Sequence, residues 1–195
     1  DKDPFALRRH ALGVIRMLIE RELPLEPAHL VSSAFAAFPA GHGQAQAELN
    51  YFLRERLVGY LREAGHAVQD VEAVIEARPP RWAEFPKRLA AVRAFKALPE
   101  SQPLAAANKR VGNILKKSEE QVAAVTDATL FVEPAERTLA DALEAVTPRS
   151  EAAFAAGDYT GSLQALAALK APVDAFFDTV MVNADDQRLR ANRLG

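Results

Sequence analysis

An apolar stripe with helical spacing in residues 172–193 limits what this chain can fold into more than any other feature. It recurs at i, i+3, i+4, i+7, i+8 and i+11, through Val173, Phe176, Phe177, Val180, Met181 and Ala184. Such spacing places them on one face of a helix, which requires a packing partner. Pro172 suits the first turn, where the N–H that proline lacks has no helical partner anyway. We expect Asn183 to end this helix in a left-handed conformation, and Asp185 or Asp186 to cap a second helix through Leu189.

Proline and glycine divide the rest of the chain into further periodic segments. Gly65 and Gly157 are expected to end helices, Asp158 to cap one, and Thr147 with Pro148 to start one. The resulting helices cover residues 3–22, 28–38, 44–64, 68–77, a stretch from 86 onward, 101–117, 134–146, 148–157 and 159–169. No segment alternates apolar and polar residues between turn signals, so the predicted class is all-α. Short connections predict an antiparallel helical bundle, preceded by a smaller helical segment.

Two consecutive prolines, Pro79 and Pro80, mark the clearest boundary in the sequence. We expect a domain junction between residues 76 and 86, which gives a helical segment over 1–77 and a second domain over 78–195. The charge balance changes sign there. Residues 78–117 carry ten Lys or Arg against two acids, whereas residues 118–186 carry three against thirteen, although the whole chain has a net charge of only -2.

The basic block is typical of a surface that binds phosphates, because neutralised phosphates release condensed counterions. A solvated basic face that balances the acidic segment is the alternative. Within the block, Val111, Ile114 and Leu115 are expected to face inward. The polar side chains at i, i+4, i+7 and i+8 share the outward side and are Lys109, Asn113, Lys116 and Lys117.

Known signatures of catalysis are missing from the sequence. It has no cysteine, and none of its four histidines stands in a metal-ligand spacing or beside an aspartate. Glycine-rich nucleotide loops and nucleophile elbows are also absent. No apolar run approaches the roughly 20 residues that span a bilayer. We therefore expect a cytoplasmic, non-catalytic chain that binds no metal and no membrane.

Three blocks of the sequence resemble one family, the β subunit of the bacterial two-subunit glycyl-tRNA synthetase. Residues 172–193 read PVDAFFDTVMVNADD-x-x-LR-x-NR, and residues 106–117 read AANKRVGNILKK. Residues 3–16, DPFALRRHALGVIR, are similar to the stretch that follows the HD-like region of that subunit. The blocks occur in the family's order and span nearly the whole chain.

The resemblance implies an all-helical, DALR-type anticodon-binding domain that grips the anticodon arm of glycine tRNA. It implies no catalytic residue here, because the partner α subunit supplies that chemistry in a heterotetramer of two α and two β subunits. No cofactor is expected in this portion, while the whole enzyme uses ATP and Mg²⁺. The residues expected to contact tRNA are Lys109, Arg110, Asn113, Lys116 and Lys117, followed by Arg188, Arg190 and Arg193.

Other interpretations differ in what the chain contacts. A helical scaffold that joins synthetase subunits without touching RNA suits the acidic residues 1–77, whereas an HD-type hydrolase lacks its metal-binding His and Asp residues here. The family usually continues past Gly195 into a further apolar helix, so we expect a shortened chain with exposed apolar surface. Phe176 and Phe177 could stack on bases, but their apolar face favours core packing.

Overall fold

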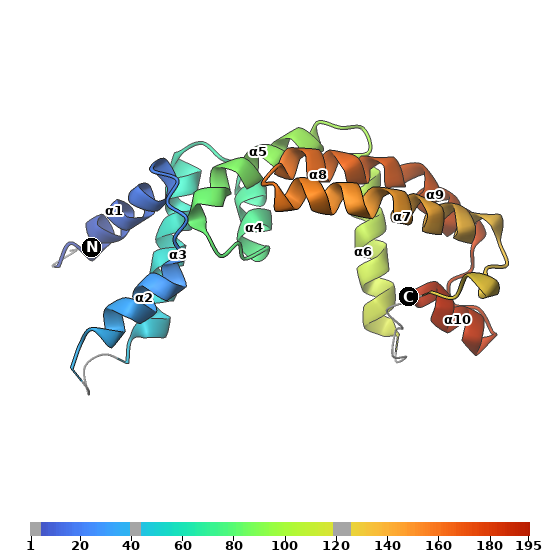
Figure 1. Ribbon diagram of the computed structural model, residues 1–195, viewed down its shortest axis with the longest axis horizontal. Coiled ribbons are helices and arrows are strands. Elements are labelled where there is room, and N and C mark those ends of the chain that lie inside the picture. Colours follow the sequence, from blue (N-terminus) through green and yellow to red (C-terminus); the bar gives the residue numbers. More distant parts are fainter. Residues whose placement is uncertain (1–4, 40–43, 119–125) are drawn as a thin grey trace. The chain divides into compact units, whose positions relative to one another are not determined.

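The computed structural model describes residues 5–39, 44–118 and 126–195. The described residues form α-helices and short 3-10 helices and contain no strand, which confirms the all-α class (Figure 1). Backbone contacts divide the chain into two compact units, residues 1–93 and 94–195, called unit 1 and unit 2 below. The expected helix start at Asp3 and Pro4 lies outside the described residues, as do residues 119–125 of the acidic segment 118–186.

Unit 1 packs its helices around two apolar clusters, one of them larger. The larger cluster includes Ile15, Leu57, Leu61, Val71 and Phe85, which are almost completely buried. Gly65 follows the third helix with φ of 87°, a conformation that glycine adopts without strain, as predicted. The elements are α1 (Leu7–Glu20), α2 (Pro27–Ala36), α3 (Gln46–Glu63), α4 (Val68–Glu76), η1 (Trp82–Glu84) and α5 (Phe85–Lys96), the last of which extends beyond the unit.

The two compact units meet further along the chain than the predicted junction at 76–86. The prolines at 79 and 80 do interrupt the helices, and Arg78 before them has a positive φ of 47°. The chain nevertheless continues to pack on unit 1, because Phe85 and Leu89 of α5 belong to the same cluster as Ile15. The break in helical structure at Pro79 and Pro80 therefore comes before the end of the compact unit at residue 93.

Unit 2 consists of helices that pack largely in pairs. Gly157, with φ of 77°, and Asp158, whose carboxylate accepts a hydrogen bond from Gly161 N–H at 2.8 Å, turn the chain between α7 and α8. Figure 1 shows these two helices side by side, as the bundle prediction requires. The elements are α6 (Ser101–Lys117), η2 (Ala128–Leu130), α7 (Pro134–Ala155), α8 (Tyr159–Leu166), η3 (Ala167–Leu169), α9 (Lys170–Thr179) and α10 (Gln187–Leu194).

The predicted helix boundary at Thr147 and Pro148 is wrong, because α7 runs through Pro148 without a break. Proline inside a helix removes one backbone hydrogen bond and costs about 3 kcal/mol. Packing on both sides of it offsets that cost. Val146 and Ser150 are buried, and Ser150 Oγ bonds to Ser162 O at 3.2 Å and to Ser162 Oγ at 2.9 Å in α8.

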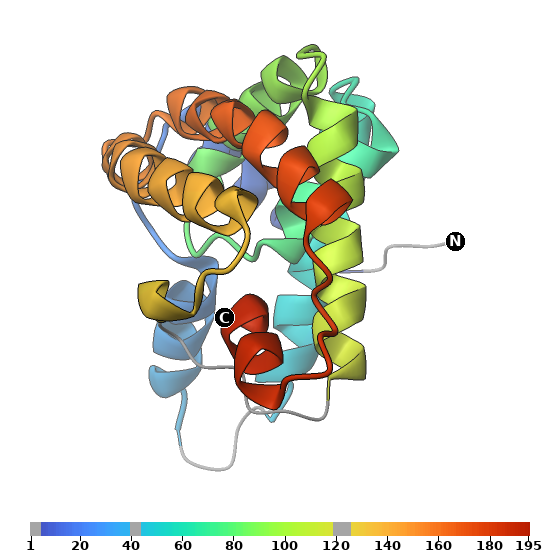
Figure 2. The same ribbon diagram turned by 90° about the vertical axis from the view of Figure 1, so that its right-hand side faces the viewer.

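The stretch 172–193 forms the predicted helix, break and second helix, but its break comes earlier than expected. α9 ends at Thr179, before β-branched Val180 and Val182, which disfavour helix. Val180 is extended and buried, whereas Met181 is 73% exposed, so the stripe is not continuous. Asn183 does not adopt the expected left-handed conformation. Figure 2 shows the extended segment after α9 leading down to α10, which lies beside α6.

Candidate nucleic-acid interface

Helix α6 carries four of the ten basic residues of the basic block, and most of its side chains are exposed. Ser101 is its only buried residue in the described chain. Val111 and Leu115, predicted to face inward, remain 40% and 39% exposed, and Ile114 is half-buried. The predicted inward face is therefore only partly covered. An exposed helix of this kind presents its polar side chains to a ligand along most of its length.

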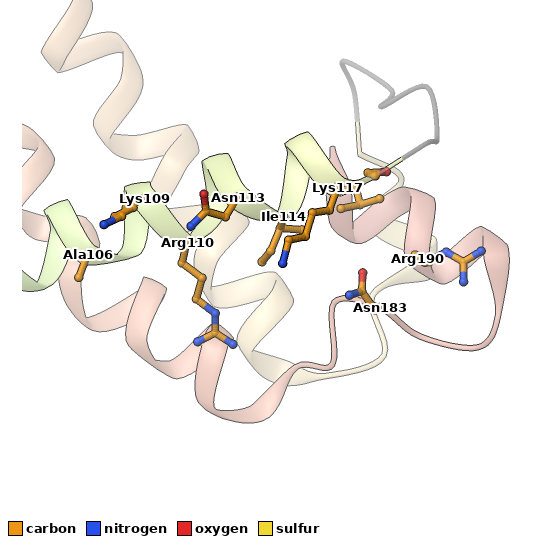
Figure 3. A pocket seen from close by; sticks show the side chains of 10 residues that line it. Ala106, Lys109, Arg110, Asn113, Ile114, Lys117, Asn183 and Arg190 are labelled. Atoms are coloured by element: carbon orange, nitrogen blue, oxygen red, sulfur yellow. The ribbon is translucent and has the colours of Figure 1, made fainter.

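A cavity of about 760 Å³ lies along α6 and is called the α6 groove (Figure 3). One wall is α6 itself, and the other comes from α10 and the segment that leads into it. Four of the lining side chains carry a positive charge, and none of the described lining residues is acidic. The lining consists of Ala106, Lys109, Arg110, Asn113, Ile114, Lys117, Ser118, Asn183, Arg190 and Leu194.

The structure brings five of the eight predicted tRNA-binding residues together in the α6 groove. They are Lys109, Arg110, Asn113, Lys117 and Arg190. Lys116 and Arg188 are exposed but lie outside the lining. Asn183 lines the groove, although it was predicted only to end a helix. Its one sequence signal was a polar residue inside an apolar run, which does not distinguish a turn from a site.

Arg193 does not fit its predicted role as a phosphate contact. Its side chain is 7% exposed and pairs with Glu136 of α7, whose side chain is 3% exposed. Arg193 Nε donates to Glu136 Oε1 at 2.8 Å, Nη2 donates to Oε2 at 3.3 Å, and Nη1 donates to Met181 O at 3.0 Å. With each guanidinium nitrogen bonded inside the protein, Arg193 holds α10 and the preceding segment onto α7.

Glu136 is held in its charged form at this contact. Burial alone would raise the pKa of Glu136, but hydrogen bonds from Arg193 and from the backbone N–H groups of Glu133 and Val132 outweigh it. The pKa of Glu136 therefore lies below its ordinary value. The same carboxylate closes a capping box at the start of α7. One buried acid thus fixes both the start of α7 and the position of α10.

A second contact fixes α10 from the other side. The Asn192 side chain accepts from Asp127 N–H at 2.6 Å and donates to Asp127 O at 3.1 Å, which joins α10 to the residue before η2. Asp186 caps α10 through bonds from Arg188 N–H at 2.8 Å and Leu189 N–H at 3.2 Å, as predicted. These contacts keep the α10 wall of the groove in place.

Arg110 joins the α6 groove to the aromatic residues of α9. Its guanidinium carbon lies 4.2 Å from the ring centroid of Phe177, which is the geometry of a cation–π contact. Phe177 in turn meets Phe176 edge to face, with centroids 5.5 Å apart. Both rings line an apolar cavity of about 510 Å³ together with Val111 and Leu115. This half-buried packing supports the interpretation of Phe176 and Phe177 as internal residues.

Comparison with known proteins finds family models and relatives that match the chain. A family model described as glycyl-tRNA synthetase beta subunit matches residues 1–76, and one described as DALR anticodon binding domain matches residues 104–195. Over its whole length the chain is 63% identical to the glycine–tRNA ligase beta subunit of Thiobacillus denitrificans. The corresponding proteins of Dechloromonas aromatica and Leptothrix cholodnii are 62% and 60% identical.

The chain belongs to the glycyl-tRNA synthetase β subunit family. It covers 28% of the length of the first two of these relatives and 27% of the third. The family predicted from three sequence blocks is confirmed. Every residue that lines the α6 groove lies inside the range matched by the DALR anticodon-binding model.

The described residues offer few features of other kinds of site. They contain no group of three or more His, Cys, Asp or Glu side chains arranged to hold a metal ion. None of their helices is both long enough and apolar enough to cross a membrane. The α6 groove, with its four positive side chains inside the range matched by the anticodon-binding model, is the candidate site.

Proposed function

We propose that this chain binds the anticodon arm of glycine tRNA through the α6 groove, as a non-catalytic portion of a glycine–tRNA ligase. The observation that carries the proposal is the groove itself. Lys109, Arg110, Lys117 and Arg190 line a cavity without an acid among its described lining residues, inside the part of the chain matched by an anticodon-binding family model. The family match supports the class of ligand, and the positive side chains of the lining support the groove as its site.

The charges in the groove suit a folded, single-stranded loop. Lysines act as point charges for phosphates, whereas arginine can also stack its planar guanidinium on a base. Phosphate contacts give affinity that is independent of sequence and sensitive to salt. Four such contacts give a slope of roughly -3 for log affinity against log salt concentration. Binding to an anticodon loop should therefore weaken steeply as salt is added.

The proposal extends to the whole enzyme of which this chain would be part. The β subunit would hold the anticodon arm in the cytoplasm while a partner α subunit uses ATP and Mg²⁺ to attach glycine to the distant 3′ end. The proposed assembly contains two α and two β subunits. The confirmed family and the relatives' name, beta subunit, support an enzyme with a separate partner chain.

The test is a binding titration of the 195-residue chain with glycine tRNA and with the same tRNA carrying a changed anticodon, at several salt concentrations. The variant Lys109→Glu/Lys117→Glu reverses two charges that line the groove. Lys116→Glu on the same helix lies outside the lining and is its control. We expect the double variant to lose at least about tenfold in affinity, because bonds to charged groups contribute roughly 1.5–3 kcal/mol each. Lys116→Glu should lose much less.

Several outcomes would contradict the proposal. Equal losses in the double variant and Lys116→Glu would mean that general charge, rather than the groove, governs binding. Affinity independent of salt would exclude phosphate contacts as its source. A folded chain that binds an α subunit but no tRNA would favour the scaffold function instead. Circular dichroism of each variant shows whether the helices are retained.

A further inference from the structure

We propose that the α6 groove takes up one unpaired base of the anticodon loop, and that Asn183 reads the identity of this base while Arg110 stacks on it. This inference rests on the proposed function and adds the residues that would give it specificity. The starting observation is that the groove contains more than positive charge. Asn113 and Asn183 also line it, and both amides are exposed without a hydrogen-bond partner in the described part of the chain.

Asn183 lies on a short segment that is held on both sides. Before it, Met181 O accepts a hydrogen bond from Arg193 Nη1 at 3.0 Å, and after it, Ala184 O accepts one from Arg190 Nη1 at 3.2 Å. Val180, one residue earlier still, is buried. A side chain that reads a base must be positioned before the ligand arrives, because ordering it on binding costs affinity. The two arginine contacts provide that positioning.

The surroundings of Asn183 suit a base better than a phosphate. Figure 3 shows Asn183 across the groove from α6, where Ile114 and Lys117 point towards the same space. A second cavity of about 500 Å³ is lined by Arg110, Ile114 and Asn183 as well, so the two cavities meet at these three residues. The second cavity also has an acid, Asp178, in its lining, which disfavours phosphate there.

Arg110 offers a flat surface at the same junction. Its guanidinium already lies over Phe177, which fixes the orientation of the planar group. Arginine planes and aromatic rings are the surfaces on which proteins stack the splayed bases of RNA loops. The α6 groove, at about 760 Å³, falls within the range of roughly 300–1,000 Å³ common for sites that hold a small ligand. One nucleotide can therefore enter with its base towards Arg110 and Asn183.

An amide is the group in this lining best suited to distinguish bases. It has an acceptor oxygen and a donor NH₂, so it can match a base edge that presents both, whereas lysine and arginine can only donate. Asn113 has the same chemistry but lines only the first cavity. Asn183 lines both, and it is the amide on the segment held by arginines. Lys109, Lys117 and Arg190 are left to hold the flanking phosphates.

The experiment measures affinity of the 195-residue chain for glycine tRNA and for a set of tRNAs with each anticodon base replaced in turn. Asn183→Ala is compared with the wild-type protein and with Asn113→Ala and Asn108→Ala. Asn113 shares the groove, and Asn108 is an exposed amide of α6 outside its lining. For Asn183→Ala we expect discrimination at one anticodon position to fall at least about tenfold, since an unsatisfied polar group on one side of a base contact costs that much. The salt slope should stay unchanged.

The results separate the base-reading inference from the proposed function. Wild-type protein that does not prefer the glycine anticodon would overturn both. Wild-type preference that Asn183→Ala retains at every position, or that Asn113→Ala loses instead, would overturn the inference and leave the proposed function intact. A uniform loss of affinity in Asn183→Ala across all tRNAs would also overturn it, because a base-reading residue changes the differences between RNAs.

A second substitution tests the stacking surface. Arg110→Lys keeps the positive charge but removes the planar group, so affinity should fall about threefold to tenfold for every RNA with an unchanged salt slope. Arg149→Lys, at an exposed arginine of α7 outside the groove lining, is the matched control and should leave affinity unchanged. Unchanged affinity in Arg110→Lys, or equal effects of the two substitutions, would show that Arg110 acts only as a charge and would remove it from the proposed base site.

Discussion

Unit 1 buries apolar side chains from α1, α3, α4 and α5 in one large cluster and has a second, smaller cluster, whereas four of the seven buried residues described in unit 2 are polar. The buried apolar residues described in unit 2 are Val146, Val180 and Leu194. Its helices are joined instead by polar contacts, such as Glu136 with Arg193 and Ser150 with Ser162. The two units thus keep their helices in place by different interactions.

This difference explains why the groove lies in unit 2. A continuous cluster draws helices together until little of their surface remains open. In unit 2 the helices keep more of their surface exposed, as on α6, where Ser101 is the only buried residue among those described. The cost is that a binding surface then depends on a small number of contacts. Substitutions in the two units should therefore have different consequences for stability and for binding.

The largest loss of stability is expected from Phe85→Ala in the cluster of unit 1. Phe85 is 2% exposed, and truncation of a buried phenylalanine costs about 3–5 kcal/mol. The same substitution at Phe154 of unit 2, which is 50% exposed and packs edge to face on Tyr159, should cost about 1 kcal/mol. Chemical denaturation of the two variants measures the difference. Similar losses would mean that unit 2 depends on apolar burial as much as unit 1 does.

Arg193→Ala should come next in size and should affect binding as well as stability. Removing one partner of a buried pair costs about 3 kcal/mol or more, because the remaining charge is left uncompensated. We expect the lower end here, since Glu136 keeps its two backbone donors. Affinity for tRNA should also fall, because α10 carries Arg190 into the groove. Both quantities are measured by denaturation and by the binding titration described above.

Arg188→Ala is the control for that prediction. It removes an exposed arginine from the same helix and should change stability by less than about 0.5 kcal/mol. If Arg188→Ala weakened binding more than Arg193→Ala did, direct contact with RNA would matter more than the positioning of α10. Equal stability of the two variants would show that the contact of Arg193 with Glu136 contributes little.

Local chemistry in the sequence predicted much of this fold. The turns at Gly65 and Gly157 and the caps at Asp158 and Asp186 all form as expected, because each depends on residues only a few positions apart. Pro148 shows the limit of such reasoning. Its helix continues because of packing against α8, which no local pattern reveals.

The candidate site was predictable to the same extent. Lys109, Asn113 and Lys117 recur at four-residue intervals, so a single helix was enough to place them on one side, and all three line the groove. Arg193 is buried rather than exposed because it pairs with Glu136, which lies 57 positions away in the sequence. The place of Asn183 depended on where α9 ends. A contact between distant segments decided the first, and the sequence alone does not contain that distance. The second has a local reason in the β-branched residues that follow Thr179.

The smallest expected effect is a dependence of stability on pH that unit 2 owes to Glu136. Because its pKa is lowered in the folded protein, the charged carboxylate stabilises the fold at pH values above its ordinary pKa of 4.5. That contribution is lost as the pH falls below this value and through the lowered pKa, where Glu136 becomes protonated. Glu136→Gln cannot titrate, so the difference in unfolding free energy between wild type and variant should shrink as the pH falls through this range. A difference that stays constant, or that grows towards acid, would mean that Glu136 is not held charged by Arg193, and the polar contact that distinguishes unit 2 would then be a neutral hydrogen bond.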